Sequence, residues 1–359
     1  MGYPKISGFS RLPKAEKITW LAKHFFQSNP IDVAREFASF LHSNVEAQKL
    51  FDGISENTLT NFYLPYSVAP NFFVNGKMYC VPMVIEESSV VAAAASAAKF
   101  WSDKGGFKTT VVSTKKIGQV HFMWHGLQEK LPAFFEYLKP KLTAGSKHLT
   151  EKMEQRGGGI SDVELVDCND MESGYYQLKV SFETCNAMGA NFINSVLEEF
   201  AKILMQEAEN YKGFSKREQE VNIIMSILSN YTPECLVRAE VSCPIEKLGS
   251  FKDGQISAEE FAFKFEKAIQ IAKYDVHRAT THNKGIFNGI DAVILATGND
   301  FRAVEACGHT YAAKDGQYRS LSDVSVEGGV FRFWLELPLA IGTIGGLTGV
   351  HPLSKRSME

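Results

Sequence analysis

The sequence predicts an α+β protein in which a large mixed α/β domain carries an inserted small domain. The chain has 359 residues, and because roughly 100–200 residues per domain is usual, we expect two domains. From residue 111 to residue 208, segments alternate in a β-α-β-β-α order, which is typical of a ferredoxin-like split β-α-β unit. We place this small domain at residues 113–234 and the large domain at residues 1–112 and 235–359.

Composition is that of an ordinary globular protein, with 45% apolar and 22% charged residues. A net charge of -3 and a pI near 6.3 argue against nucleic-acid binding. The six cysteines are scattered without a CxxC pair, as expected for reduced thiols, and the histidines lack metal-ligand spacing. Neither a signal-peptide core nor an apolar run long enough for a membrane span is found. We therefore expect a cytoplasmic protein without a metal site.

The first hundred residues contain three kinds of segment in order. Residues 13–50 have phenylalanine and leucine anchors that predict helices. Residues 62–86 are strand-like, and Asn75-Gly76 between two apolar runs is a strong hairpin signal. The alanine-rich stretch Ser88–Trp101 favours a helix.

Glu86 and Glu87 lie at the junction between the second strand and this helix. They follow the apolar run VPMVI, where partial desolvation would raise the pKa of a carboxyl and make it a proton donor near neutral pH. The alternative is an ordinary charged helix N-terminus, stabilised by the helix dipole. The residues alone leave both interpretations open.

The remaining elements follow from strand-like runs and helical periodicity. The strand-like runs are VVSTKKIGQVHFMW, ISDVELVDC and YYQLKVSFETC. A polar helix from Leu131 to about Gln155 separates the first two, and Asn191–Ala208 has apolar residues at helical spacing. Ser257 and Glu260 form a capping-box signature that opens another helix.

Tyr274–Ala306 is the segment richest in candidate chemistry. We expect its polar residues on loops with turn-forming glycines, around the buried run Ile290–Ala296. The segment contains two cations (Arg278 and Lys284), an amide (Asn288) and a carboxylate (Asp300). This combination suits the binding of an anionic, carbonyl-bearing ligand. Lys284 is placed to stabilise an oxyanion, although a solvated surface lysine is the simpler alternative.

The motif Asn186-Ala-Met-Gly-Ala-Asn191 joins an apolar strand to an amphipathic helix. Gly189 would let the backbone approach a ligand, so that amides at the helix start face a phosphate. A glycine needed only for a tight turn explains the motif equally simply. The triple glycine at residues 157–159 has the same ambiguity. Neither a GxGxxG fingerprint nor a GxxxxGK[ST] loop is present.

Taken together, several motifs resemble class II 3-hydroxy-3-methylglutaryl-coenzyme A (HMG-CoA) reductases, the bacterial-type form without a membrane anchor. The motifs are THNKGIFNGID, ATGNDFRAVEA, NAMGAN, VPMVIEESSVVAA and residues 56–72. They run from about residue 8 to residue 352 in the order of the family. The lysine in THNKG, with none close after NAMGAN, indicates class II rather than the membrane-anchored class.

The resemblance implies an NAD(P)H-dependent oxidoreductase of the mevalonate pathway, which reduces HMG-CoA to mevalonate and CoA. Lys284 would stabilise the oxyanion, Glu87 would donate protons, and Asp300 would hold both in one network. The hydroxymethylglutaryl group would be bound by Ser89, Arg278 and Asn288. Two alternatives stay open: a non-catalytic CoA-ester-binding protein, and the same enzyme run oxidatively in mevalonate degradation.

For the cofactor, the resemblance implies a dinucleotide site in the small domain, with the HMG-CoA site in the large domain. The site would be lined by Asn186, Met188, Gly189 and Asn191. Where NAD-preferring relatives have an aspartate, seven residues before the triple glycine, this chain has Thr150 with Lys147, His148 and Lys152 nearby. This charge pattern favours NADPH over NADH, unless these are only solvated helix residues.

The resemblance also implies a homodimer, or a higher oligomer built from it, with the active site at the interface. Two departures bear on these expectations: Asn186 replaces the usual aspartate, and Thr60 replaces a glycine in the dimer-forming segment. The family continues into a C-terminal flap whose histidine protonates the CoA thiolate, whereas this sequence ends at LSKRSME. We expect the flap to belong to a longer form of the protein, with a naturally truncated protein as the alternative, and we expect the flapless chain to be impaired.

Overall fold

The computed structural model describes residues 5–359, so the first four residues of the predicted large domain lie outside the described part. Two compact units divide the chain, one up to Pro65 and one from Tyr66 to Glu359. The mixed helix and strand content confirms the predicted α+β class. The predicted boundaries at residues 113 and 234 stay a prediction.

The first unit is helical, as residues 13–50 predict. A 3₁₀ turn at Phe9–Arg11 precedes three helices: α1 (Lys14–Phe25), α2 (Pro30–Ser39) and α3 (Val45–Asp52). Asn29 and Asn44 cap α2 and α3 by accepting hydrogen bonds from amides of the first turn. Its apolar core is small, because among residues 5–65 the buried apolar side chains are those of Ile18, Ala22 and Val33.

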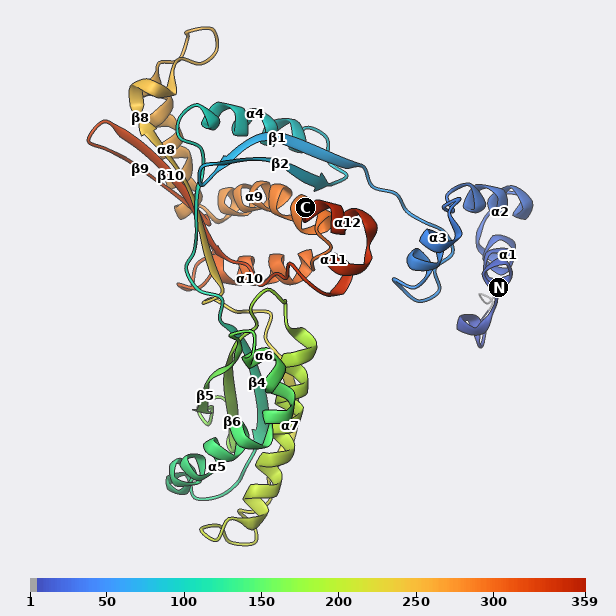
Figure 1. Ribbon diagram of the computed structural model, residues 1–359, viewed down its shortest axis with the longest axis vertical. Coiled ribbons are helices and arrows are strands. Elements are labelled where there is room, and N and C mark those ends of the chain that lie inside the picture. The colour runs from blue at the N-terminus through green and yellow to red at the C-terminus, as the bar shows by residue number, and fades with distance from the viewer. Residues whose placement is uncertain (1–4) are drawn as a thin grey trace. The chain divides into compact units, whose positions relative to one another are not determined.

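The second unit starts with the predicted hairpin, β1 (Tyr66–Val74) and β2 (Lys77–Val84). Asn75 and Gly76 have φ of 49° and 84°, the left-handed pair that a tight hairpin turn needs. The hairpin lies between α4 (Val90–Ser102), which packs on β1, and α9 (Val276–Ala296), which packs on β2 (Figure 1). Glu86 and Glu87 lie in the turn between β2 and α4, and both act on side chains of α9: Glu87 pairs with Lys284, and Glu86 acts on Asp291.

A four-stranded antiparallel sheet supports α9 and α10 (Phe301–Ala312). Its strand order is β3-β8-β10-β9. The bounds are Lys108–Val111 for β3, Leu236–Pro244 for β8, Ser322–Glu327 for β9 and Val330–Pro338 for β10. The short helix Ile245–Leu248 leads to α8 (Ala258–Tyr274), where Ser257 accepts from the amide of Glu260. This confirms the predicted N-terminal cap.

The third sheet has the predicted split β-α-β order. Its antiparallel strands are ordered β5-β6-β4-β7, with bounds Gly159–Asp167 for β5, Tyr175–Glu183 for β6, Lys116–Met123 for β4 and Asn222–Leu228 for β7. Helices α5 (Leu131–Gly145), α6 (Lys147–Glu154) and α7 (Ala190–Asn210) accompany it, and α7 runs along the sheet in Figure 1. Val120, Phe122, Leu178, Leu197 and Phe200 form its fully buried core.

The single helix predicted from Leu131 to Gln155 is wrong. Two helices meet at buried Ser146, whose amide bonds to the carbonyl of Leu142 while its own carbonyl accepts from Thr150. A 3₁₀ turn at Gln128–Lys130 precedes them. The chain ends in the short helices α11 (Gly346–Val350) and α12 (Pro352–Ser357). In residues 5–359, no helix is both long and apolar enough to cross a membrane.

Candidate active site

The segment expected to be a pair of loops is instead helix α9, so the loop prediction was wrong. Asp275 caps the helix by accepting from the amides of His277 (2.7 Å) and Arg278 (3.2 Å). Its buried positions, which include Ala279, Asn283 and Phe287, recur at helical spacing. Packing of this face outweighs the cost of about 1 kcal/mol for each glycine inside the helix. Lys284, Asn288 and Asp291 therefore share one face of α9.

Lys284 meets Glu87 across the space between α9 and the β2–α4 junction. Its ammonium lies 2.5 Å from the carboxylate of Glu87. The two side chains keep 60% and 45% of their surface exposed, respectively, so a ligand can reach both. The structure thus brings together two of the three predicted catalytic residues, which are 197 positions apart in the sequence.

The predicted substrate-binding residues lie on α9, which carries Lys284, and at the start of α4, which follows Glu87. Ser89 has a left-handed φ of 72° at the start of α4, and its hydroxyl caps no amide there. Arg278 is exposed, and its guanidinium makes no ion pair within the described residues. Asn288, one turn after Lys284 on α9, is half-buried.

Asp300 is engaged differently from the predicted network. Its carboxylate caps α10 through the amides of Arg302 and Ala303, and it also accepts from the guanidinium of Arg302 at 3.0 Å. Arg302 accordingly lowers the pKa of the Asp300 carboxyl. No hydrogen bond joins Asp300 to Lys284 or Glu87 in the described part of the chain, so their shared network stays a prediction.

Asp291 is the desolvated carboxyl of this region, a property that the sequence assigned to Glu86 and Glu87. Burial raises the pKa of Asp291 to about 7, with further contributions from Glu305 and Glu86. One of its oxygens is buried without a hydrogen-bond partner among the described residues. Glu87, by contrast, is half-exposed beside a cation. The signal that could have identified Asp291 is its spacing of seven residues from Lys284, two turns along one face.

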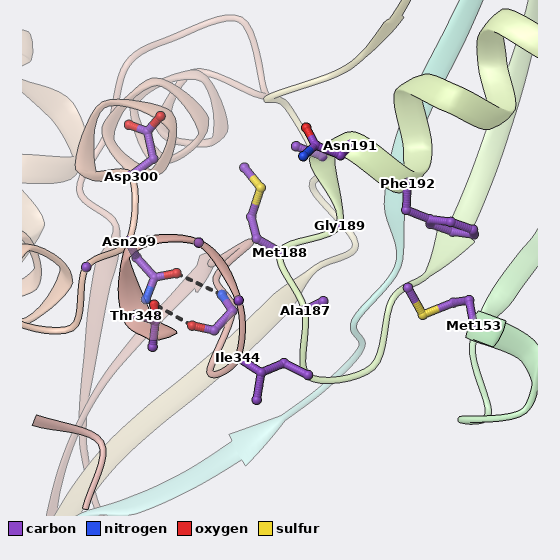
Figure 2. Close-up of a pocket in the computed structure, with 15 residues that line it drawn as sticks. Met153, Ala187, Met188, Gly189, Asn191, Phe192, Asn299, Asp300, Ile344 and Thr348 are labelled. Carbon is purple, nitrogen blue, oxygen red and sulfur yellow. Dashed lines mark hydrogen bonds between the residues drawn. The ribbon is translucent and has the colours of Figure 1, made fainter. Parts of the chain in front are cut away.

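A separate cleft of about 460 Å³ lies between the start of α7 and the start of α10. Met188, Gly189 and Asn191, all predicted for a dinucleotide, line one side, and Asp300 lines the other (Figure 2). Gly189 has φ of 88°, and a Cβ there would lie 2.5 Å from Cγ2 of Thr184. Both the backbone conformation and the packing therefore require glycine at the helix start.

The opposite wall of the cleft is the loop of residues 342–346, which sequence reasoning missed. Asn299 holds it by two hydrogen bonds to the backbone of Gly342, drawn in Figure 2. The amide of Thr343 donates to the carbonyl of Asn186 (2.8 Å). A Cβ on Gly342 would lie 2.6 Å from the amide of Met188, so this glycine allows two backbones to touch. The run IGTIGG was the available signal.

Two of the predicted cofactor residues do not line this cleft. Asn186 contributes its backbone carbonyl to the wall contact, and its side chain is exposed. Thr150 is buried, and its hydroxyl donates to Glu154 (2.6 Å), which is also paired with Lys147. The neighbouring Met153 does line the cleft. The pocket thus approaches α6 without using the hydroxyl of Thr150.

Three histidines hold structural positions. His282 bonds to the hydroxyl of Ser322 (2.7 Å), and His309 bonds to Tyr318 (2.7 Å). His351 accepts from the amide of Ser354 at the start of α12. None of them lies on the Lys284 face of α9 or lines the cleft. In residues 5–359 no group of three or more His, Cys, Asp or Glu residues could hold a metal ion.

Comparison with known proteins identifies relatives over nearly the whole chain. The family model described as hydroxymethylglutaryl-coenzyme A reductase matches residues 16–358. The 3-hydroxy-3-methylglutaryl-coenzyme A reductase of Archaeoglobus fulgidus is 33% identical over 366 residues, which cover 100% of this chain and 75% of that protein. A probable enzyme of the same name from Borreliella burgdorferi is 32% identical over 347 residues, which cover 94% of this chain and 76% of that protein.

A solved structure shares the fold. It is the class II 3-hydroxy-3-methylglutaryl-CoA reductase from Streptococcus pneumoniae bound to NADPH in open conformations. The TM-score is 0.77 at 34% sequence identity, and the match covers 99% of this chain and 91% of that chain.

Proposed function

This chain belongs to the hydroxymethylglutaryl-coenzyme A reductase family, in its class II form, and we propose that it reduces HMG-CoA to mevalonate. Two hydrides and two protons are consumed. The first hydride converts the thioester carbonyl into a hemithioacetal, which releases CoA as the thiol when the C–S bond breaks. The second hydride reduces the resulting aldehyde to a primary alcohol. The same carbonyl oxygen therefore gains negative charge twice.

The observation that carries this proposal is the pairing of Lys284 with Glu87. A cation placed at a developing alkoxide stabilises the transition state, and removal of one such donor typically costs about 10²–10³ in kcat. Lys284 supplies this charge, and Glu87 transfers the proton that neutralises the oxygen. We assign Asp300 as the third member of the network. It joins by exchanging its bond to Arg302 for one to Lys284.

The groups around this pair fit the hydroxymethylglutaryl part of the substrate. Arg278, exposed and without an ion pair in the described residues, is suited to the terminal carboxylate. Asn288 and Ser89 offer an amide and an uncommitted hydroxyl for the substrate hydroxyl and carbonyl. Arg278 and Asn288 lie on α9 with Lys284, and Ser89 lies two residues after Glu87 at the start of α4. Together they would hold the substrate with its thioester carbonyl at the Lys284–Glu87 pair.

The cleft at the start of α7 fits a dinucleotide. Its volume lies in the usual range of about 300–1,000 Å³ for ligand pockets, and it combines apolar walls with the first amides of a helix of 21 residues. Such amides bind phosphate, and Gly189 permits close approach. When bound, the nicotinamide supplies the hydride. Met188, Gly189 and Asn191 would hold and orient it beside Asp300.

NADPH is the cofactor that we favour over NADH. The pneumococcal relative is described as bound to NADPH. Lys147 is compensated by Glu154, but Lys152 and His148 on α6 are exposed and make no ion pair within the described residues. Their charge favours a 2′-phosphate. Initial rates with NADPH and NADH at equal concentration test this preference, and comparable rates would contradict it.

A homodimer is the assembly that the first unit supports. Phe25, Phe26, Phe40 and Phe62 are exposed in a unit with a small core, as expected of a surface that a second copy covers. Light scattering during size-exclusion chromatography should give twice the mass of the 39.9 kDa chain. A monomer at micromolar concentration would contradict this assignment.

The decisive test is HMG-CoA-dependent oxidation of NADPH by wild type and Lys284→Ala. We expect kcat to fall by about 10²–10³-fold in the variant. Lys264→Ala is the matched control, since Lys264 is an exposed lysine that is paired with Glu260 on α8 and has no assigned role in the site. Near-normal turnover by Lys284→Ala would exclude the assigned role. HMG-CoA binding without any cofactor oxidation by wild type would favour a CoA-ester-binding protein instead.

A further inference from the structure

Lys116, the first residue of β4, is a buried cation that the reaction described above does not use. Only 4% of its surface is exposed. Its ammonium forms no ion pair with a carboxylate in residues 5–359, although burying an unpaired charge is costly. The hydrogen bond that the ammonium makes indicates which part of the structure this buried charge holds in place.

The ammonium of Lys116 donates to the hydroxyl oxygen of Thr184 at 2.7 Å. An ammonium has no lone pair and can only donate, so the hydroxyl proton of Thr184 must point elsewhere. It points to the carbonyl of Ala187, also at 2.7 Å. The amide of Ala187 in turn donates to the carbonyl of Thr184 (3.0 Å). Lys116 thereby fixes the direction of the hydroxyl that closes this turn.

Thr184 transmits this constraint to the cofactor cleft. Its methyl group packs so closely on Gly189 that an added Cβ would lie only 2.5 Å away. From the other side, Gly342 approaches the amide of Met188, and the amide of Thr343 holds the carbonyl of Asn186. The backbone that carries Met188 and Gly189 into the cleft is therefore held between Thr184 and the 342–346 loop. Figure 2 shows Met188 and Gly189 beside this loop.

We propose that Lys116 is a positioning residue for the dinucleotide cofactor, acting through Thr184 to hold the turn before α7 in its binding shape. The inference rests on the proposed function, because it assigns the dinucleotide to the cleft at Gly189. It also assigns a purpose to the buried charge. A neutral side chain of similar length would fill the same space, but the hydroxyl of Thr184 would then be held by the carbonyl of Ala187 alone.

The test is the affinity of the full chain for NADPH, measured by fluorescence titration without HMG-CoA. We expect Lys116→Met to raise the Kd at least about tenfold, since hydrogen bonds to charged groups contribute about 1.5–3 kcal/mol and 1.4 kcal/mol is tenfold. Thr184→Val should weaken binding similarly. The double variant should be no weaker than Lys116→Met, because both changes break one chain of bonds. Lys116→Arg, which keeps the donor, should recover most of the affinity.

Steady-state kinetics and a matched control separate positioning from general stability. In Lys116→Met the KM for NADPH should rise, while kcat and the KM for HMG-CoA change less than about twofold. Lys130→Met removes an ion pair with Glu218 in the 3₁₀ turn that follows β4. It should lower the urea midpoint and leave the Kd for NADPH unchanged. If Lys116→Met does not fold, Thr184→Val carries the test.

Two results would overturn the inference: an unchanged Kd for NADPH in both single variants, or equal weakening of NADPH and HMG-CoA binding. If wild type itself binds no NADPH, the assignment of the cleft to a dinucleotide fails instead. The two failures are therefore distinguishable.

Discussion

The two halves of the proposed site are built from different materials. On α9 and the β2–α4 junction, ionisable side chains such as Lys284, Glu87 and Asp291 would define the chemistry. Lys284 and Asp291 stand on the regular helix α9, and Glu87 stands on the turn before α4. At the cleft, glycines and backbone amides define the shape. The buried Lys116 does not line the cleft and acts on it through Thr184. Activity and stability in the first half should therefore depend on side-chain charge and on pH. Cofactor binding in the second half should depend on the size of the side chains.

Glycines allow a direct test of this difference, because each half contains one at a critical place. At Gly189 an added Cβ would meet Thr184 at 2.5 Å, and φ is 88°. At Gly285, next to Lys284, an added Cβ would meet nothing within 4 Å. Replacement of glycine by alanine should therefore weaken cofactor binding at Gly189 and slightly stabilise the fold at Gly285.

The largest effect is expected from Gly189→Ala. A non-glycine residue at this φ costs about 1–3 kcal/mol, and the contact with Thr184 adds strain that the turn relieves only by moving. We expect the Kd for NADPH to rise by more than tenfold while HMG-CoA binding is retained, with titration of both ligands as the measurement. A Kd for NADPH within twofold of wild type would show that the turn is not part of the cofactor site.

Local signals in the sequence predicted much of the fold. The Asn75-Gly76 turn, the Ser257 cap and the β-α-β-β-α order of segments after residue 111 each depend on adjacent residues or on one periodic pattern. The sequence did not predict helix α9, because its glycines are typical of loops. In the structure, the Asp275 cap and the burial of one face stabilise the helix. Local propensity is a weak guide where packing opposes it.

The site was predictable only in part, for the same physical reason. Residue types and family motifs pointed to Lys284 and Glu87, but no spacing rule predicts an ion pair 197 residues apart. The contact of the 342–346 loop with Asn186 is also long-range. Burial of Asp291 and Lys116 depends on elements distant in sequence, so their unusual environments appear only in three dimensions.

A smaller effect, dependent on pH, is expected from Asp291→Asn. The folded protein holds a proton on Asp291 up to a pKa of about 7, whereas the unfolded chain releases it near the ordinary value of 3.8. Between these values the folded state binds more protons, so stability falls as pH rises and the loss is complete above about pH 7. Asparagine cannot ionise and removes this loss. The gain in urea midpoint over wild type should grow from pH 5 to pH 7 and then level off.

Asp162→Asn is the control with the opposite sign. Lys139 and the amide of Val163 lower the pKa of Asp162, so this carboxylate stabilises the fold above its unfolded pKa and loses that contribution in acid. Its replacement should lower the urea midpoint at pH 7 and have less effect at pH 3. A gain for Asp291→Asn that is independent of pH would mean that burial, rather than ionisation, limits stability at α9.

The smallest effect, and the sharpest contrast with Gly189→Ala, is expected from Gly285→Ala. Alanine is favoured over glycine inside a helix by about 0.8–1 kcal/mol, and the open space around Gly285 removes any steric cost. The urea midpoint should therefore rise slightly, with an unchanged Kd for NADPH. If Gly285→Ala instead lowers kcat while the fold is stabilised, the open space beside Lys284 is used by the bound substrate. That result would show that the half around Lys284 also limits the size of side chains when substrate is bound. The contrast between a charge-dependent half and a size-dependent half would then hold for the free protein only.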